Sequence, residues 1–80
     1  MSTESPDRLE NRERQVLYVS GYGEDAGLEP GSFYKLLIEA FFKADGDNLA
    51  RLMTAFPITG QAFKSYMTGA LTKKYDLQEV

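Results

Sequence analysis

The sequence predicts a mainly α fold: a small three-helix domain with a disordered N-terminus and at most one short extended segment. The chain has 80 residues, which is enough for one domain at most. Apolar residues recur with a helical period in three stretches, residues 32–44, 48–56 and 59–71. Gly, Pro, Asp and Asn residues separate these stretches and predict the turns between helices.

Residues 1–15 are predicted to form a disordered or weakly helical N-terminal tail. The interior of this stretch holds a single large apolar residue, Leu9, and one leucine does not anchor a helix to a core. The alternative is a helix that starts at Pro6 and is supported by Glu10 and Arg14, which are four residues apart.

Residues 16–75 are predicted to form a single small helical domain, and residues 76–80 a C-terminal tail. The domain begins with the apolar run Val16–Val19, which glycines follow, and this pattern predicts the short extended segment. Such a segment would pair with the C-terminal residues or lie across the helices. The polar residues 24–31 contain Gly and Pro and predict a loop.

The three helices have recognisable start and stop signals. Ser32 is predicted to cap the helix over residues 32–44. The turn Asp45–Asn48 ends that helix, and its acidic residues are predicted to cap the next one. Pro57 disfavours helical backbone at the residue before it, so the second helix is expected to end there. Thr59 is predicted to start the third helix.

The helix over residues 32–44 differs from the other two because it is apolar on most of its circumference. The second and third helices each carry one apolar stripe, which is typical of a helix with one buried face. The first carries a predicted core stripe and a second stripe beside it. The predicted core stripe comprises Phe33, Leu36, Leu37, Ala40, Phe41 and Ala44.

The second stripe, formed by Tyr34, Ile38 and Phe42, is the predicted interaction surface. Two interpretations remain open: the stripe is covered by another part of this chain, or it contacts another chain. Full burial of Ile38 and Phe42 would stabilise the fold by roughly 1.5–3 kcal/mol each, whereas their exposure would leave an apolar surface patch that favours association. Tyr18 and Tyr22 are predicted to add to the surface, because aromatic side chains bury a large area at low entropic cost.

The composition argues against catalysis. The chain has no Cys, which excludes disulfides and thiolate metal sites. It has no His, which removes the commonest zinc ligand and the commonest general base. No pair of carboxylates falls clearly on an apolar face. The sequence therefore predicts that the protein is not an enzyme, with no catalytic residue, no metal site and no cofactor.

Three short motifs resemble functional signatures but fit turns and caps better. Residues 21–26, GYGEDA, match G-x-G-x-x-A, but the acidic Glu24–Asp25 pair would repel a phosphate. Residues 32–35, SFYK, match S-x-x-K without the companion motifs of acyl-serine enzymes. Residues 45–48, DGDN, lack the third ligand and the glycine of a calcium loop.

The charge balance argues against nucleic acid as the main partner. Nine Lys and Arg against twelve Asp and Glu give a net charge of −3, so a basic footprint for nucleic acid is absent. Lys73 and Lys74 beside Tyr75 leave a weak nucleic-acid or small-ligand binding module as the alternative. No apolar run approaches the ~20 residues of a membrane helix, and the polar N-terminus does not match a secretory signal, so a cytoplasmic location is expected. Self-association remains open, because small scaffolds often need such a staple.

The central block, residues 29–57, resembles a pattern in small uncharacterised proteins of bacteriophages and prophages. The residues that carry the match are Gly31-Ser32-Phe33, Leu37-Ile38-Glu39-Ala40, Ala44-Asp45, Asn48-Leu49 and Phe56-Pro57. The resemblance implies a small phage or mobile-element accessory protein in the cytoplasm of a bacterial host, and it carries over no catalytic or binding residue. We expect a non-enzymatic protein that acts by protein–protein contact, as a homo-oligomer or as an inhibitor of a host protein.

Overall fold

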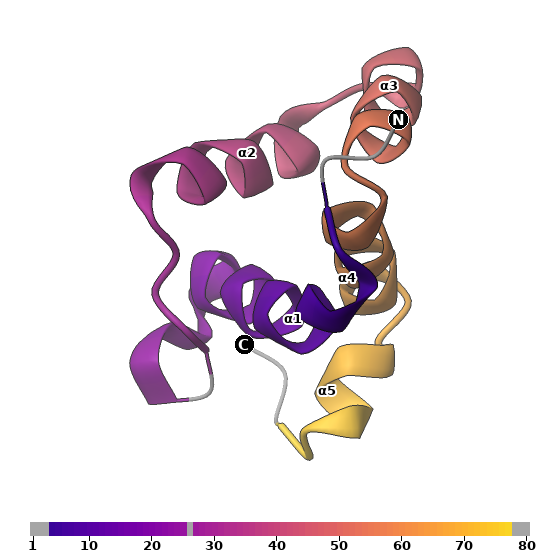
Figure 1. Cartoon of the computed structure of the whole chain (residues 1–80). Coiled ribbons are helices and arrows are strands. Elements are labelled where there is room, and N and C mark those ends of the chain that lie inside the picture. Colours follow the sequence, from indigo (N-terminus) through magenta and orange to yellow (C-terminus); the bar gives the residue numbers. More distant parts are fainter. Residues whose placement is uncertain (1–3, 26, 78–80) are drawn as a thin grey trace.

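The computed structural model describes residues 4–25 and 27–77 (Figure 1). The described residues are mainly helical, which confirms the predicted class, but they form five α-helices, so the predicted count of three was too low. No described residue lies in a strand. The α-helices are α1 (Leu9–Leu17), α2 (Ser32–Lys43), α3 (Gly46–Ala55), α4 (Pro57–Met67) and α5 (Ala70–Lys74). Three helical turns, η1 (Pro6–Arg8), η2 (Tyr18–Tyr22) and η3 (Gly23–Asp25), flank α1.

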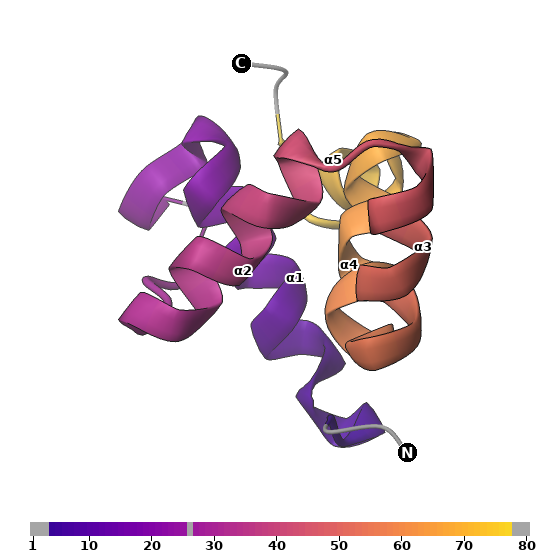
Figure 2. The ribbon, with the colours of Figure 1, turned by 90° about the horizontal axis from the view of Figure 1, so that it is seen from above.

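Helix α1 lies at the centre of the molecule. It packs chiefly against α4 and also contacts α2, which crosses it (Figures 1 and 2). Its buried residues are Glu13, Gln15, Val16 and Leu17. Residues 9–15, predicted to belong to a disordered or weakly helical tail, thus form most of a buried helix. Of that predicted tail, residues 1–3 lie outside the described residues.

The predicted extended segment is helical. Residues 16 and 17 end α1, and residues 18–22 form the wide turn η2, in which Gly21 has a φ of 126°. The chain then folds back across α1, where the backbone N–H of Leu28 donates to the carbonyl oxygen of Arg14 at 3.1 Å. Gly27 passes so close to η2 that a Cβ atom on it would lie 2.6 Å from the backbone nitrogen of Tyr18.

Two apolar clusters form the core. Val16, Ile38 and Ala62 form the first cluster, which joins α1, α2 and α4. The second cluster is formed by buried residues of α2 and α4, and side chains of α3 pack against it. Its buried members are Leu37, Phe41 and Phe63. Helix α2 therefore contributes to both clusters.

The buried face of α2 agrees with the prediction only in part. Leu37, Ile38 and Phe41 are buried, whereas Phe33 and Leu36 are 59% and 67% exposed. The predicted core stripe is therefore confirmed for Leu37 and Phe41 and was wrong for Phe33 and Leu36. The physical reason is α1, most of which was predicted to belong to a disordered or weakly helical tail and which covers the side of α2 that carries Ile38.

A capping aspartate, a proline and a glycine set the ends of the remaining helices. Asp45 or Asp47 was predicted to cap the second helix, and Asp45 does so, because its Oδ1 atom accepts a hydrogen bond from the backbone N–H of Asn48 at 3.0 Å. Helix α4 starts at Pro57, not at Thr59, and a proline is well suited to a first helical position. Gly69, with a φ of 85°, separates α4 from α5 within the predicted third helix.

Helices α3 and α4 lie side by side and pack closely (Figure 2). Gly60 lies in this contact, and a Cβ atom on it would come within 3.1 Å of Cγ of Met53. Of the predicted C-terminal tail, Asp76 and Leu77 donate backbone hydrogen bonds to the carbonyl groups of Lys73 and Thr72, and residues 78–80 lie outside the described residues. Within residues 4–25 and 27–77, no helix is long and apolar enough to cross a membrane.

Candidate functional site

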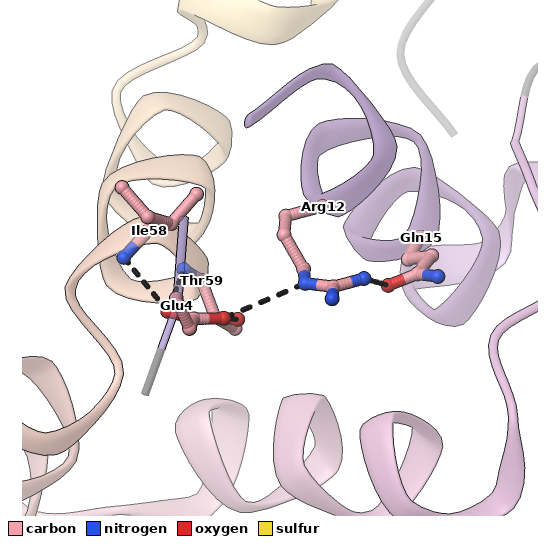
Figure 3. Close-up of polar contacts among 5 residues, drawn as sticks. All are labelled: Glu4, Arg12, Gln15, Ile58 and Thr59. Carbon is pink, nitrogen blue, oxygen red and sulfur yellow. Dashed lines mark hydrogen bonds and ion pairs between the residues drawn. The ribbon is translucent and has the colours of Figure 1, made fainter. Parts of the chain in front are cut away.

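A buried carboxylate from the start of the chain lies at the N-terminus of α4 (Figure 3). Oε1 of Glu4 accepts hydrogen bonds from the backbone N–H groups of Ile58 and Thr59, both at 2.8 Å. Oε2 accepts a hydrogen bond from the Thr59 hydroxyl. The side chain of Glu4 is 1% exposed. The carboxylate thus caps a helix whose first residues lie more than fifty positions later, where N–H groups have no partner within the helix.

Arg12 neutralises this carboxylate and connects it to two more side chains. Nε of Arg12 is buried and lies 3.4 Å from Oε2 of Glu4, an ion-pair contact without good hydrogen-bond geometry. Its Nη1 atom donates to Oε1 of Gln15 at 2.8 Å, and the guanidinium lies 3.7 Å from the ring centroid of Tyr34. We call Glu4, Arg12, Gln15 and Thr59 the Glu4 cluster. It is a structural junction between α1, α2, α4 and the N-terminal segment.

A second polar cluster attaches α5 to α1. Oε1 of the buried Glu13 accepts hydrogen bonds from Nζ of Lys74 at 2.7 Å and from the hydroxyl of Tyr75 at 2.9 Å. The hydrogen bond to Glu13 raises the pKa of Lys74. Burial, aided by the Glu13 carboxylate, raises the pKa of Tyr75. Of the predicted contacts of the alternative nucleic-acid module, Lys74 and Tyr75 are bonded to Glu13, although Lys74 is exposed, and Lys73 is exposed as well.

The acidic loop does not form a metal site among the described residues. Glu24 and Glu29 are exposed to solvent, and the side chain of Asp25 is outside the described part of the structure. Across the described residues, no three His, Cys, Asp or Glu side chains gather in an arrangement that could hold a metal ion.

An apolar cleft of about 470 Å³ lies where α2, α3 and α4 meet, and it is the candidate site. Among its lining residues, Phe42 and Met67 are 38% and 61% exposed. The Phe42 ring packs edge-on against Phe63, with ring centroids 5.0 Å apart, so its position is fixed by α4. The apolar cleft is lined by Phe41, Phe42, Ala44, Leu49, Met53, Phe63, Lys64 and Met67.

The structure separates the five predicted interaction residues. Ile38 is 0% exposed and so cannot contact a partner, which corrects the prediction for that residue. Tyr34 is half-buried beneath a guanidinium group. Tyr18 and Tyr22 are half-buried in η2 and do not line the apolar cleft. Phe42 alone among the five lies at the cleft.

Sequence reasoning missed Met53, Lys64 and Met67 as parts of one surface. In the sequence pattern, the two methionines fall on the apolar stripes of separate helices, and Lys64 falls on the polar side of the third predicted helix. The signal that could have joined them is the shortness of the connections α2–α3 and α3–α4, which makes consecutive helices neighbours in space. The apolar stripes of the three helices then meet next to the turns.

Comparisons of the chain with protein-family models, curated proteins and solved structures found no match. The relation to small phage and prophage proteins thus remains a prediction from residues 29–57.

Proposed function

We propose that this chain is a non-enzymatic protein that acts by protein–protein contact, and that the apolar cleft is its contact surface. As the resemblance implies, it would serve as an accessory protein of a bacteriophage or mobile element in a bacterial cell. The observation that carries the proposal is the exposure of two large apolar side chains, Met67 and Phe42, in a cleft whose lining is apolar except for Lys64.

The chemistry of the lining suits contact with another protein. Apolar surface left in water does not contribute to stability, and the net free energy of unfolding of a domain of this size is small. Persistent exposure of large apolar side chains is therefore a mark of an interaction site. The thioethers of Met53 and Met67 are flexible and polarizable, so they adapt to the side chains of a partner. The fixed ring of Phe42 provides a rigid anchor beside them.

The polar residues support a non-enzymatic role. The chain has no His and no Cys, the residue types most used as general base and nucleophile. Its buried carboxylates Glu4 and Glu13 are both engaged with neighbouring helices. Both carboxylates therefore serve the fold.

A photo-crosslinking experiment tests the proposal. A photoreactive amino acid replaces Met67 in the full chain, which is expressed in bacterial cells, and the crosslinked protein is identified by mass spectrometry. The identified protein is then purified and mixed with the unmodified chain. We expect a complex that the substitution Met67→Asp weakens at least tenfold, because a carboxylate would have to be buried among apolar side chains.

Position 51 provides the matched control, because Arg51 is exposed on α3 and does not line the apolar cleft. A photoreactive group there should not crosslink the same protein. Equal crosslinking from both positions, or a reconstituted complex that Met67→Asp leaves as tight as before, would contradict the proposal. Circular dichroism of each variant checks that the helices are intact.

A further inference from the structure

We infer that the N-terminus of α4 and Arg12 form a carboxylate-binding site, and that Glu4 occupies this site as a ligand tethered to the chain. The N-terminal segment, residues 4–8, is then a strap. When the strap detaches, the helices stay folded and the site opens to a small carboxylate from solution. The inference concerns a different part of the molecule from the apolar cleft and does not depend on the proposed function.

Helix α4 has 11 residues and no local cap at its N-terminus. Phe56 holds the capping position, where its side chain accepts no hydrogen bond. Pro57 has no N–H group, and the N–H of Gly60 donates to the carbonyl oxygen of Phe56 at 2.8 Å. The N–H groups of Ile58 and Thr59 both donate to the carboxylate from the N-terminal segment. The start of α4 therefore needs one acceptor group from elsewhere.

The donors of this site match a single carboxylate group (Figure 3). Two N–H groups donate to one oxygen of Glu4, and the Thr59 hydroxyl donates to the other. Arg12 supplies one positive charge, which balances the one negative charge of a carboxylate. Its buried Nε atom lies 3.4 Å from Oε2 of Glu4 and forms no hydrogen bond among the described residues. A carboxylate that is free of the backbone can approach this donor more closely, so the tethered ligand leaves one donor of the site unused.

Glu4 anchors the N-terminal segment to the rest of the fold. Its side chain is 1% exposed, whereas Ser5, Asp7 and Arg8 are exposed to solvent. The backbone N–H of Arg8 donates to the carbonyl oxygen of Ser5, a hydrogen bond within the segment. Short terminal segments with few buried groups open at a lower free energy than the core. Release of the Glu4 carboxylate is therefore expected to free the segment as far as α1.

The closed strap keeps other carboxylates out of the site. Thr59 is 0% exposed, so a ligand from solution reaches its donors only when the strap is open. A short flexible tether gives its ligand an effective concentration in roughly the millimolar range, and a free carboxylate must compete with that concentration. The intact chain is therefore expected to bind free carboxylates weakly, and a chain without the Glu4 carboxylate to bind them readily.

Removal of the internal ligand tests the site. Glu4→Ala deletes a group of the size of acetate, so sodium acetate should raise the melting temperature of this variant by several degrees over sodium chloride at the same concentration. The reason is that a ligand stabilises a protein when it binds only the folded state. The unmodified chain, in which the site is filled, and Glu29→Ala, which lacks an exposed carboxylate, should not show this difference. If Glu4→Ala is unfolded in chloride, its helical circular dichroism should appear as acetate is added.

Amide chemical shifts locate the bound acetate. In Glu4→Ala, the amides of Ile58 and Thr59 should shift with acetate, whereas that of Asn48 should not, because Asp45 already caps its helix. Addition of Thr59→Val should weaken acetate binding severalfold, since one donor is lost. Equal effects of acetate and chloride on the melting temperature of Glu4→Ala, or shifts away from the start of α4, would overturn the carboxylate site.

Hydrogen exchange in the unmodified chain tests the strap. After correction for intrinsic rates, the amides of Ile58 and Thr59 should exchange faster than that of Phe63 in the middle of α4, because opening of the strap releases them without unfolding the helix. Exchange of all three amides at one rate, set by global unfolding, would show that the segment does not open separately and would overturn the strap.

Discussion

At the scale of single residues, Arg12 contacts more separate parts of the fold than its place near the start of the chain suggests. It lies against the Glu4 carboxylate, donates to Gln15 on its own helix, and stacks on Tyr34 of α2. A guanidinium suits this position, because its planar group can form hydrogen bonds at its edge while its face lies on an aromatic ring. If any of these side chains is removed, the guanidinium of Arg12 loses a favourable contact in a place that water reaches poorly.

Removal of the Glu4 carboxylate is expected to destabilise the protein strongly. In Glu4→Ala, Arg12 would lose its buried counter-ion, and the N–H groups of Ile58 and Thr59 would lose their acceptor. The loss of one partner from a buried pair typically costs about 3–5 kcal/mol. Urea unfolding should therefore show a lower midpoint with a similar slope. Glu29→Ala, at an exposed loop position, is the control and should shift the midpoint little.

A glycine substitution tests the close passage of the loop over η2. A Cβ atom on Gly27 would overlap the backbone of Tyr18, so Gly27→Ala should lower the melting temperature by several degrees. Gly46→Ala is the matched control, because a Cβ atom there would meet no atom within 4 Å. That variant should be neutral or slightly more stable, since alanine restricts the unfolded chain. Equal melting temperatures for both variants would show that the loop does not pass close to Tyr18 in solution.

At the scale of secondary-structure elements, sequence reasoning succeeded where local signals set the helix. The predicted ranges 32–44 and 48–56 correspond to α2 (Ser32–Lys43) and α3 (Gly46–Ala55), because prolines, glycines and the Asp45 cap lie next to the helix ends. The prediction that Ser32 caps α2 was wrong, because Ser32 is its first helical residue and the capping position is held by Gly31. For residues 9–15, sequence reasoning left a disordered tail and a helix as alternatives, and the pattern did not favour the helix, because buried positions of α1 hold Glu13 and Gln15. A hydrophobicity pattern counts such residues as exposed, and their buried partners come from distant parts of the chain.

The start of α4 and the cleft show the same limit. Thr59 was predicted to cap this helix, but the capping carboxylate comes from Glu4, and no local pattern reveals a cap from that distance.

The candidate site was predicted in part: Phe42 was identified, whereas Ile38 was covered by α1 and α4. Of the two interpretations left open for the second stripe, cover by another part of this chain is confirmed for Ile38.

Helix α5 should detach from α1 at alkaline pH. The pKa values of Lys74 and Tyr75 are raised above 10.5 and 10.0 in the folded protein, so the folded state holds these protons more tightly than the unfolded state. Their contribution to stability is complete below pH 10.0 and is lost as the pH rises through the folded-state pKa values. We therefore expect urea midpoints to fall above pH 10 in part through loss of this contact.

Absorbance at 295 nm reports the ionisation of the tyrosines and isolates this effect. Tyr75→Phe should remove the phenol whose ionisation is delayed by burial, and Glu13→Gln should bring its ionisation to lower pH, because the carboxylate that raises the pKa of Tyr75 is gone. The outcome that would contradict the structure is a titration curve from which Tyr75→Phe removes no component that ionises at high pH. The Tyr75 hydroxyl would then not be buried beside Glu13.

At the scale of the whole molecule, the arrangement of helices resolves the excess of apolar surface on α2. Helix α1 covers Ile38, and α4 contributes Ala62 and Phe63 to the two core clusters. The chain thus buries Leu37, Ile38 and Phe41 of α2 without a second molecule. The large apolar side chains that remain exposed are the Phe33–Leu36 pair, Phe42 and Met67 at the cleft, and Leu28.

The purified chain is accordingly expected to be monomeric at moderate salt. Light scattering at increasing protein concentration should give a constant molar mass of about 9.0 kDa. The physical reason is that the core of the fold is covered within one chain and that a charged residue, Lys64, lies in the lining of the cleft. A mass that rises toward a dimer as the protein concentration increases would show that the exposed apolar groups are sufficient for self-association.

The long sequence distance between Glu4 and α4 has a consequence for biosynthesis. A ribosome releases Glu4 into the cell well before Ile58 and Thr59, which lie 54 and 55 residues later. Until α4 is synthesised, Glu4 and Arg12 must remain hydrated, and α2 lacks one of the two helices that cover it. These helices are therefore expected to fold together only after α4 has emerged, and nascent fragments that end before α4 would be targets for proteases and chaperones.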